Sequence, residues 1–354
     1  MISKGIINLN KPANMTSHDC VNVLRRFTGV KRIGHTGTLD PMATGVLPLC
    51  IGPSVRITEY LEMDFKKYRC TLVFGLETDT QDIWGKTVLD ERERLKIRQK
   101  TAPLITEEKI NNIVKEFDGV ITQIPPKYSA LKVNGKKLYE YARAGEEVEI
   151  KSRMVYIKYF MVNNIDLDQM TLGFDVTCSK GTYVRTICVD IGHKLGVSAA
   201  MSSLIRLESG AFTLENSVTM EQLMAIRTSE DVRDPVTGRY LEYGRADSEK
   251  LKQLLIPTDF PLIYFGEFII PEDRASWFVT GGHIAISEGT IISEPIYKNQ
   301  EPPFKIREEY KKAYKMYTVM KTGKKFLGVA FYNTTYNKLV ADKIFLRGLE
   351  DADF

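Results

Sequence analysis

Apolar residues alternate with polar ones in several segments, and this two-residue period predicts β-strands. The clearest case is the segment 67–74, in which every second residue is apolar or aromatic: Tyr68, Cys70, Leu72 and Phe74. These side chains would share one buried face of a strand. Two further strands are predicted over residues 154–162 and 172–178. After Pro257 the chain continues as short strands separated by Gly and Asn turns, at 269–271, 315–321, 326–332 and 339–345.

Helices are predicted where apolar residues recur every three or four positions, or where a capping signature begins a segment. Their expected starts are Ser17, Thr106, the residue after Thr186, Met201, and Thr219 with Gln222. Gly29 and Gly119 are expected to end the first two, because glycine readily adopts the left-handed conformation that terminates a helix. Since strands and helices alternate without a regular βαβ rhythm, the predicted fold is α+β: a mixed, largely antiparallel sheet flanked by helices.

The change of pattern near Pro257 predicts two domains. Residues 1–256 would form the main domain, and residues 257–354 a small β-rich domain. Three charged or polar stretches are predicted to be solvated additions to the surface; they lie at 89–100, 227–250 and 298–315.

Composition narrows the class of protein. The chain has 354 residues, 43% of them hydrophobic, which is enough to bury a large core. Neither a membrane span nor a secretory signal is expected, because no apolar run is long enough. The five cysteines are scattered, so neither a zinc site nor a disulfide framework is indicated, and a reducing cytoplasm is expected. The net charge of +4 alone does not indicate nucleic-acid binding, although clustered basic residues would suffice for it.

The segment 34–47 contains a single carboxylate, Asp40, among small and turn-forming residues. Its three glycines and Pro41 allow tight turns and a close approach of the backbone to a ligand. A lone aspartate on a constrained loop is a candidate nucleophile. The alternative for an isolated Asp-Pro pair is an Asx turn, in which the carboxylate caps its own backbone.

This segment, Gly-His-Thr-Gly-Thr-Leu-Asp-Pro-Met-Ala-Thr-Gly-Val-Leu, closely resembles the catalytic loop of the bacterial tRNA pseudouridine-55 synthases, the TruB family. Further segments match that family in the expected order: 5–12 with 16–17, 67–68, 75–82, 125–137, 180–186 and 204–212. Several long motifs in one order are far more specific than one short pattern. The resemblance covers roughly the first 225 residues. It implies an enzyme that flips a base and converts uridine to pseudouridine at position 55 of the tRNA T loop, with no cofactor and no metal.

The resemblance implies catalytic roles for three residues. Asp40 matches the nucleophile, and whether it attacks C1′ of the sugar or C6 of the base, or first removes the 2′ proton, stays open. Tyr68 matches the tyrosine that stacks on the flipped base and takes the C5 proton. Arg185 matches the arginine that pairs with the aspartate and favours its ionised form. By pattern alone, Tyr68 would be a core residue and Arg185 an exposed strand residue.

Substrate contacts are implied for four more residues. His35 would hold the flipped-out nucleotides rather than act as a general base, and Leu204 would lie against the uracil. Asp82 would accept hydrogen bonds behind the catalytic groups, and Lys11 would contact the RNA. A structural histidine, a core leucine and a turn cap are the alternatives for the first three.

Residues 123–150 are expected to form a mobile thumb that grips RNA, as in the family. Here Lys132 and Lys136 flank Asn134-Gly135, which is a signal for a tight hairpin turn. Basic residues interleaved with Tyr128 suit a loop that holds phosphates and splayed bases. The expected partner is therefore the T stem-loop of tRNA, with residues 257–354 as an RNA-binding module of the PUA kind. A monomer that needs no protein partner and no membrane is expected.

One departure from the family is Asn14, which stands where glycine is usual. Because asparagine tolerates the left-handed conformation better than most residues, the turn is expected to survive.

Three other functions compete with this one. A guide-RNA-dependent relative shares the aspartate loop, but the segment 127–137 is of the stand-alone bacterial type. A non-catalytic module that binds tRNA and promotes its folding would be favoured if Asp40, Tyr68 or Arg185 were missing, and all three are present. A nucleotidyltransferase is disfavoured because the second histidine of a His-x-Gly-His pattern is absent after His35.

Overall fold

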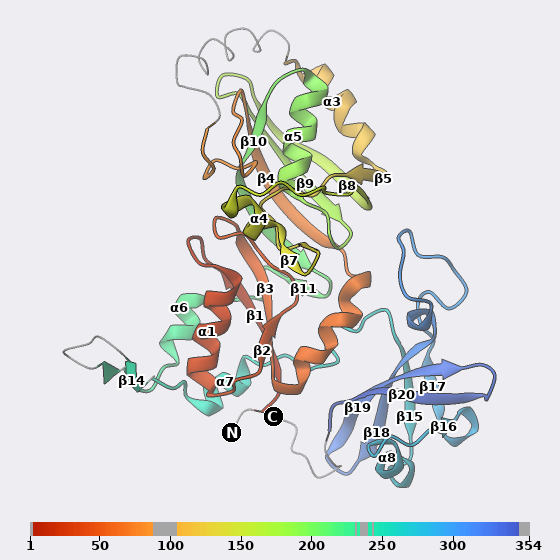
Figure 1. Cartoon of the computed structure of the whole chain (residues 1–354). Helices are drawn as coiled ribbons and strands as arrows, with labels where there is room; N and C mark the ends of the chain where they lie inside the picture. Colours follow the sequence, from red (N-terminus) through yellow and green to blue (C-terminus); the bar gives the residue numbers. More distant parts are fainter. Residues whose placement is uncertain (1–2, 88–104, 231, 234–239, 243, 347–354) are drawn as a thin grey trace. The chain divides into compact units, whose positions relative to one another are not determined.

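The computed structural model describes residues 3–87, 105–230, 232–233, 240–242 and 244–346 (Figure 1). Its strands are β1 (Gly5–Lys11), β2 (Ile33–His35), β3 (Thr44–Ile51), β4 (Lys66–Phe74), β5 (Gly119–Gln123), β6 (Lys132–Val133), β7 (Lys136–Lys137), β8 (Arg153–Asp166), β9 (Thr171–Cys178), β10 (Ala199–Ser209), β11 (Phe212–Thr213), β12 (Val218–Thr219), β13 (Val232–Arg233), β14 (Tyr240–Glu242), β15 (Gly266–Ile270), β16 (Ile284–Ala285), β17 (Thr290–Ser293), β18 (Ala313–Met320), β19 (Gly323–Asn333) and β20 (Lys338–Ile344). Its α-helices are α1 (Ser17–Thr28), α3 (Glu107–Val114), α4 (Leu138–Ala144), α5 (Val184–Leu195), α6 (Met220–Ala225), α7 (Ser248–Gln253) and α8 (Glu272–Phe278). Its 3₁₀ helices are η1 (Gly52–Met63), η3 (Lys115–Phe117), η4 (Ile286–Glu288) and η5 (Glu308–Lys312).

The chain divides into two compact units. The first unit comprises residues 1–40, 46–63 and 210–354, and the second comprises residues 41–45 and 64–209. One of the crossings between the units therefore falls between Asp40 and Pro41, within the Gly-rich loop.

The second unit is built on an antiparallel sheet. Its strands lie in the order β10-β4-β9-β8-β5, and each neighbouring pair is antiparallel. The first two residues of β3, Thr44 and Gly45, pair with Ile205 and Arg206 of β10 in parallel. A Cβ at Gly45 would lie 2.2 Å from the main-chain oxygen of Arg206, so only glycine permits this approach.

Helices α3 and α5 lie together beside this sheet (Figure 1). The thiol of Cys188 on α5 lies 3.5 Å from the thiol of Cys70 on β4. The face of β4 that carries Cys70 is therefore the face that α5 covers.

The first unit contains a second sheet, with strand order β16-β20-β19-β18-β15-β17. Only β15 and β18 run parallel in it. The core beneath this sheet also takes in residues from the start of the chain, because Ile6 and Tyr60 pack in one cluster with Phe265, Tyr310 and Phe345. The ring centroids of Tyr60 and Phe265 lie 5.3 Å apart, edge to face.

The strand predictions are confirmed. Tyr68, Cys70, Leu72 and Phe74 form the buried face of β4, and β8 and β9 contain the two strands that were predicted next. The four strands predicted after Pro257 correspond to β15, β18, β19 and β20, although the helix α8 interrupts this β-rich region. The α+β class with a largely antiparallel sheet is also confirmed.

The helix predictions need corrections. Thr16, not Ser17, caps α1: its side chain and that of Asp19 form a reciprocal capping box, and Ser17 is the first helical residue. The helix expected after Thr186 begins earlier, at Val184, which makes Arg185 helical rather than an exposed strand residue. No helix exists at Met201, because residues 199–209 form β10, which is paired with β4. Pairing with a neighbouring strand overrides the ambiguous apolar pattern there.

Other helix ends are as expected or close to it. Gly29 ends α1 with φ 72°, and Thr219 with Gln222 forms the capping box of α6. Thr106 caps α3, but this helix ends at Val114 and Gly119 instead opens β5 with φ 86°.

The three charged stretches differ in how far the structure describes them. The stretch 89–100 lies outside the described residues, and the stretch 227–250 is described only in part. The stretch 298–315 contains η5 and leads into β18.

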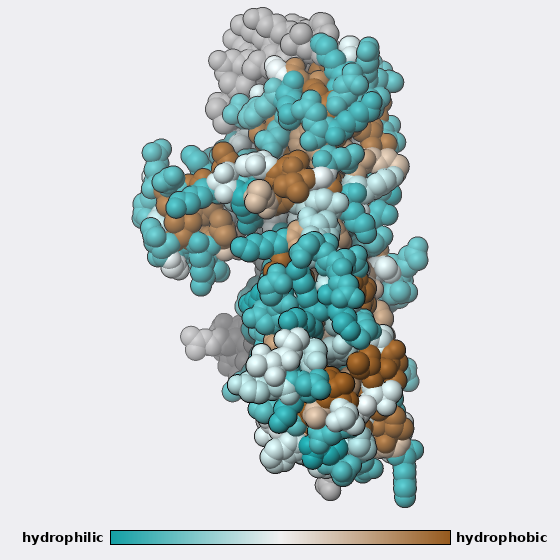
Figure 2. Space-filling model, turned by 90° about the vertical axis from the view of Figure 1, so that its right-hand side faces the viewer, coloured by the Kyte–Doolittle hydropathy of each residue, from teal (hydrophilic) through white to brown (hydrophobic). Residues whose placement is uncertain are grey.

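Some apolar surface remains exposed on the C-terminal sheet. Figure 2 shows it in the lower half of that view, and the exposed fractions of Ile291 and Ile292 on the edge strand β17 are 38% and 54%. Among the described residues, no helix is long and apolar enough to cross a membrane.

Candidate active site

The backbone that leads into Asp40 is fixed within the first unit. The hydroxyl of Ser17 donates to the main-chain oxygen of Leu39 at 3.1 Å and accepts from its N–H at 2.9 Å. Ser17 and Leu39 are both buried, so these hydrogen bonds are shielded from water. Asp40 itself is half-buried and follows directly. The first helical residue thus anchors the loop that carries the candidate nucleophile.

The turn that follows β1 is organised by Lys11. Its ammonium group is fully buried and donates to the main-chain oxygens of Pro12 and Met15, at 2.8 and 2.7 Å. Asn14 in this turn has φ 64°, which confirms that the asparagine adopts the left-handed conformation. The two hydrogen bonds from Lys11 to the main chain stabilise this turn. The expected contact between Lys11 and RNA stays a prediction.

His35 lies at the end of β2, where it pairs with Leu49 of β3. It is half-buried. The next residue, Thr36, continues the pairing through a hydrogen bond from its N–H to the oxygen of Pro48. The Gly-rich loop therefore starts from a fixed strand end.

Arg185 occupies the first turn of α5, in the second unit, and is only 5% exposed. Its Nη1 donates to the main-chain oxygen of Thr80 at 2.8 Å, and its Nη2 donates to that of Tyr128 at 2.9 Å. Nη1 also lies 3.8 Å from Oδ2 of Asp82. The planar guanidinium thus joins the segment of Asp82 to the base of the predicted thumb.

Asp82 is held in turn by its own neighbours. Its Oδ1 accepts from the hydroxyl of Thr80 at 2.8 Å and from the N–H of Trp84 at 3.0 Å. It is 7% exposed, so the carboxylate and the Arg185 guanidinium form a buried ion pair in which each group is hydrogen-bonded to other residues. Asp82 thus accepts hydrogen bonds, and its place behind the catalytic groups stays a prediction.

Tyr68 and Leu204 lie on one face of the same sheet. Strand register places Tyr68 of β4 opposite Arg206 of β10, and Cys70 opposite Leu204. Because side chains two residues apart share a face, all four point the same way, toward the face that α5 covers. Tyr68 and Leu204 are 8% and 7% exposed. The structure thus brings Tyr68, Leu204 and the helix of Arg185 to one side of the second unit.

The predicted hairpin of the thumb is confirmed. Asn134 and Gly135 have φ 50° and 82°, and β6 and β7 pair on either side of them. Two positive φ angles in a two-residue loop define a type I′ turn. Lys132 is exposed, whereas the ammonium of Lys136 forms an ion pair with Glu146 at 2.8 Å and lies 4.5 Å from the ring centre of Tyr141. The two lysines are therefore not equivalent.

Two buried ionisable residues that the sequence analysis missed precede Tyr68: Asp64 lies just before β4, and Lys66 is its first residue. Asp64 is 2% exposed and burial raises its pKa to about 7, while Lys66 is 8% exposed and burial lowers its pKa to about 8. Lys66 lies two residues before Tyr68, on the same face of the strand. Only the alternation of β4 could have revealed Lys66 in the sequence, and nothing there indicated the burial of Asp64.

The cysteines have no features of nucleophiles. All five are free and buried, and burial raises the pKa of Cys20 and Cys178 to about 11 and that of Cys50 to about 12. Thiols in this state stay protonated at neutral pH and are inert. In the part of the chain that the structure describes, no cluster of three or more His, Cys, Asp or Glu residues could hold a metal ion.

Comparison with known proteins gives the family. The model of the N-terminal domain of TruB family pseudouridylate synthases matches residues 25–184, and that of the tRNA pseudouridylate synthase B C-terminal domain matches residues 185–262. A protein of Alkaliphilus oremlandii named tRNA pseudouridine synthase B is 40% identical over 280 residues, which is 79% of this chain and 82% of that protein. This chain belongs to the TruB family.

Other relatives extend the similarity. A tRNA pseudouridine synthase B of Ligilactobacillus salivarius is 45% identical over 80% of this TruB chain and 86% of that protein. One of Limosilactobacillus reuteri is 38% identical over 88% of this chain and 96% of that protein. Among solved structures, a Cbf5-Nop10-Gar1 complex contains a chain with a TM-score of 0.65 and 21% identity, covering 97% of this chain and 85% of that one. At this identity the last likeness concerns the fold alone.

The candidate residues of this TruB chain are divided between the two units. Asp40, His35 and Lys11 belong to the first unit, and Tyr68, Asp82, Arg185, Leu204 and the two thumb lysines belong to the second. Ser17 is the contributor that sequence reasoning misassigned, as a helix cap. The signal was present in the adjacent Thr16, since only one of two neighbouring hydroxyls can cap α1.

Proposed function

We propose that this TruB chain isomerises uridine to pseudouridine at position 55 in the T loop of tRNA, by base flipping and with Asp40 as nucleophile. The observation that carries the proposal is the similarity, at 38–45% identity over 79–88% of the chain, to proteins named tRNA pseudouridine synthase B. The fixed loop of Asp40 and the buried Arg185–Asp82 pair support it, because a nucleophile and its partners need defined positions.

The proposed reaction balances without a co-reactant. The C1′–N1 glycosidic bond breaks, the uracil rotates, a C1′–C5 bond forms, and the proton of C5 is lost while N1 gains one. Asp40 provides the carboxylate, which attacks C1′ or C6 or first removes the 2′ proton. Tyr68 stacks on the flipped base and takes the C5 proton, and its buried place on β4 beside Leu204 suits a ring that faces an apolar surface.

Arg185 would favour the ionised carboxylate of Asp40 and set its direction. The carboxylate of Asp82 and the main-chain oxygens of Thr80 and Tyr128 hold the guanidinium, so its orientation is fixed before the RNA binds. His35 is proposed to hold the flipped-out nucleotides.

The proposed division of labour follows the chain. Residues 1–256 would form the catalytic domain with the thumb at about 123–150, and residues 257–354 would add an RNA-binding domain. The T stem-loop of tRNA is the proposed substrate. We further propose that the protein acts in the cytoplasm as a monomer, without a protein partner.

The proposal is tested with an unmodified tRNA transcript and the Asp40→Asn variant. Pseudouridine is mapped by chemical adducts that stop reverse transcription. The native chain is expected to give a single stop at position 55. Asp40→Asn is expected to give none while binding tRNA with an affinity within about threefold of native, since the amide keeps the shape of the carboxylate.

Each alternative outcome has a definite meaning. Tight tRNA binding by the native chain without any stop would favour a module that binds and folds tRNA. Equal loss of binding and turnover in Asp40→Asn would assign Asp40 to RNA recognition instead of catalysis.

A further inference from the structure

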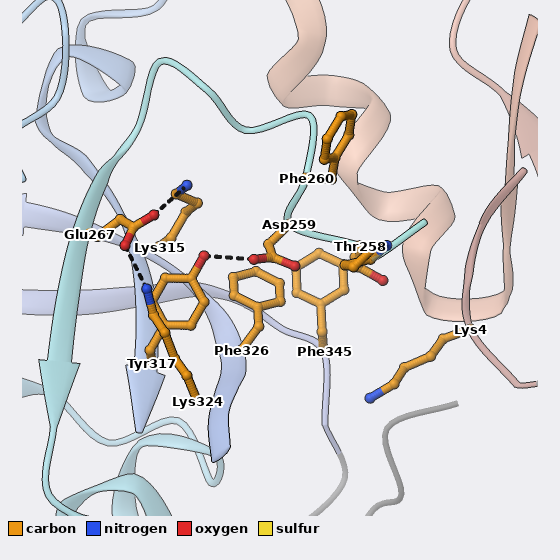
Figure 3. A pocket seen from close by; sticks show the side chains of 11 residues that line it. Lys4, Thr258, Asp259, Phe260, Glu267, Lys315, Tyr317, Lys324, Phe326 and Phe345 are labelled. Carbon is orange, nitrogen blue, oxygen red and sulfur yellow. Dashed lines mark hydrogen bonds and ion pairs between the residues drawn. The ribbon is translucent and has the colours of Figure 1, made fainter. Parts of the chain in front are cut away.

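A pocket of about 520 Å³ lies in the first unit, where the segment 257–260 runs past β18 and β19. Its size is within the range of sites that hold small ligands or one to two nucleotides. It is lined wholly by residues of the first unit, so none of the candidate residues of the second unit, such as Tyr68 and Arg185, contributes to it. Figure 3 shows its lining, which combines aromatic rings with lysines.

Aromatic rings form one part of the pocket. Phe326 and Phe345 lie next to each other in the centre of the view, with ring centroids 5.4 Å apart, and Tyr317 extends this wall (Figure 3). Phe260 lies at the end of the segment 257–260 and is 44% exposed. An exposed phenylalanine beside a pocket leaves one ring face available for stacking, which is where a nucleobase would gain most.

Lysines form the other part. Glu267 accepts from Lys315 at 2.9 Å and from Lys324 at 2.6 Å, so a single carboxylate faces two ammonium groups. Lys324 also lies 3.9 Å from the ring centre of Tyr317, and its side chain is 42% exposed. Counting Lys4, the lining has more lysines than carboxylates, since only Glu267 and Asp259 oppose them. This surplus positive charge at an aromatic wall favours an anionic ligand with a flat ring over a cationic one.

A hydrogen-bond acceptor, Asp259, also lines the pocket. The hydroxyl of Tyr317 donates to Oδ2 of Asp259 at 2.6 Å, and burial raises the pKa of Tyr317, so this donor is retained at all working pH values. The second carboxylate oxygen, Oδ1, is the atom that would meet amino or imino groups on the edge of a base.

We propose that this pocket holds an unpaired stretch of one or two nucleotides of bound RNA. A base stacks on Phe260. A phosphate draws Lys324 away from Glu267, which keeps its ion pair with Lys315. The inference rests on the proposed function for the identity of the RNA, which would be the substrate tRNA outside its T loop. The pocket would thus add a contact that strengthens tRNA binding without touching the reacting uridine.

The test uses single-stranded RNA tetranucleotides that contain 5-bromouridine and carry a fluorescent end label. Ultraviolet crosslinking to the full chain, followed by peptide mass spectrometry, is expected to mark the peptide that contains Phe260 or the one that contains Phe326. Phe260→Leu keeps the contact with Phe212 but removes the aromatic face. It is expected to bind the tetranucleotide about tenfold more weakly. Lys324→Ala is expected to lower the salt slope of binding by about 0.7.

Matched variants provide the controls. Tyr336→Ala removes a ring that is 72% exposed and lies outside the pocket, and Lys338→Ala removes an exposed lysine of β20. Both are expected to bind as the native chain does. Turnover of an isolated T stem-loop by Phe260→Leu is expected to equal that of the native chain.

Two results would overturn the proposal. Unchanged affinity in both Phe260→Leu and Lys324→Ala would show that the pocket does not hold RNA. Equally tight binding of free uridine or adenosine monophosphate would assign the pocket to a mononucleotide ligand. Because tetranucleotide binding and crosslinking need no turnover, they are informative even if the proposed isomerisation is not observed.

Discussion

At the scale of single residues, burial decides how the charged groups of this TruB chain behave. Arg185 and Asp82 are almost fully buried, and each makes hydrogen bonds beyond their ion pair. A buried pair of this kind is retained only if its geometry is satisfied, because removing one partner leaves the other charge without compensation. Asp64 shows the opposite case, since its Oδ1 is buried without a hydrogen-bond partner.

Arg185→Lys is expected to lower both stability and turnover. Lysine cannot reproduce the planar fork that reaches Thr80 and Tyr128, so we expect a loss of about 2–4 kcal/mol in the free energy of unfolding. Urea denaturation measures this loss. Lys194→Ala on the same helix removes an exposed ion pair with Glu116 and should cost less than about 1 kcal/mol. Equal effects of the two variants would contradict the assigned role of Arg185.

Asp64→Asn is expected to change the pH dependence of stability. Burial raises the pKa of Asp64 from 3.8 to about 7, so between these values the folded chain keeps a proton that the unfolded chain loses. The contribution of Asp64 to the free energy of unfolding is therefore fully present below pH 3.8 and is lost as the pH rises toward 7. The variant lacks this loss, so it should match the native chain near pH 4 and exceed it at pH 7 by up to about 4 kcal/mol, since each pKa unit corresponds to about 1.4 kcal/mol.

Thermal unfolding at pH 4, 5.5 and 7 checks this prediction. Lys66, whose pKa is lowered to about 8, titrates above that window. Asp118→Asn, at an exposed position, is the control and should show no such pH-dependent difference from the native chain. The same difference in stability between Asp64→Asn and the native chain at all three pH values would contradict the prediction.

At the scale of elements, local sequence and tertiary contacts contribute differently. The hairpin β6–β7 needs only Asn134 and Gly135, whose positive φ angles set its type I′ turn. β10 needed its neighbours: an apolar pattern that suggested a short helix at Met201 became a strand beside β4. The thumb lysines combine both influences, because the hairpin places them and Glu146 then engages one of them.

Lys132→Ala is expected to weaken RNA binding more than Lys136→Ala does. Lys132 is exposed, whereas Lys136 must first leave Glu146 to reach a phosphate. Loss of one phosphate contact lowers the slope of log K against log salt by about 0.9 on duplex RNA, by analogy with DNA. The slope is measured by titrating a T stem-loop at salt concentrations from about 50 to about 200 mM. Glu146→Gln should release Lys136 and tighten binding, and weaker binding in that variant would contradict the argument.

At the scale of the whole molecule, one core joins the two ends of the chain within the first unit. Ile6 and Tyr60 pack with Phe265, Tyr310 and Phe345. The main-chain oxygen of Glu59 also accepts a hydrogen bond from the hydroxyl of Tyr310. The boundary predicted at residue 257 therefore separates segments that share buried surface. The predicted boundary marks a change in the sequence pattern, whereas the shared core shows that residues on both sides of it pack together.

A chain that ends at residue 256 is expected to be much less stable than the full chain. It would expose the faces of Ile6 and Tyr60 that now pack on the C-terminal sheet, and loss of a buried aromatic contact typically costs about 3–5 kcal/mol. Binding of an apolar dye and a lowered melting temperature would register this exposure. If the shortened chain melts at the temperature of the full chain without binding dye, the shared core does not stabilise the first unit.

The sequence by itself determined the family, the α+β class, the strand β4, the hairpin of the thumb and the left-handed turn at Asn14. These features depend on local periodicity, on turn chemistry or on motifs that are contiguous in the chain. Only the tertiary structure decided that Arg185 is buried against Thr80 and Tyr128, that Ser17 holds Leu39, and that Asp64 lies away from water. These outcomes depend on groups that are distant along the chain. Burial sets how strongly charged groups interact, and a residue becomes buried only when those distant groups pack together.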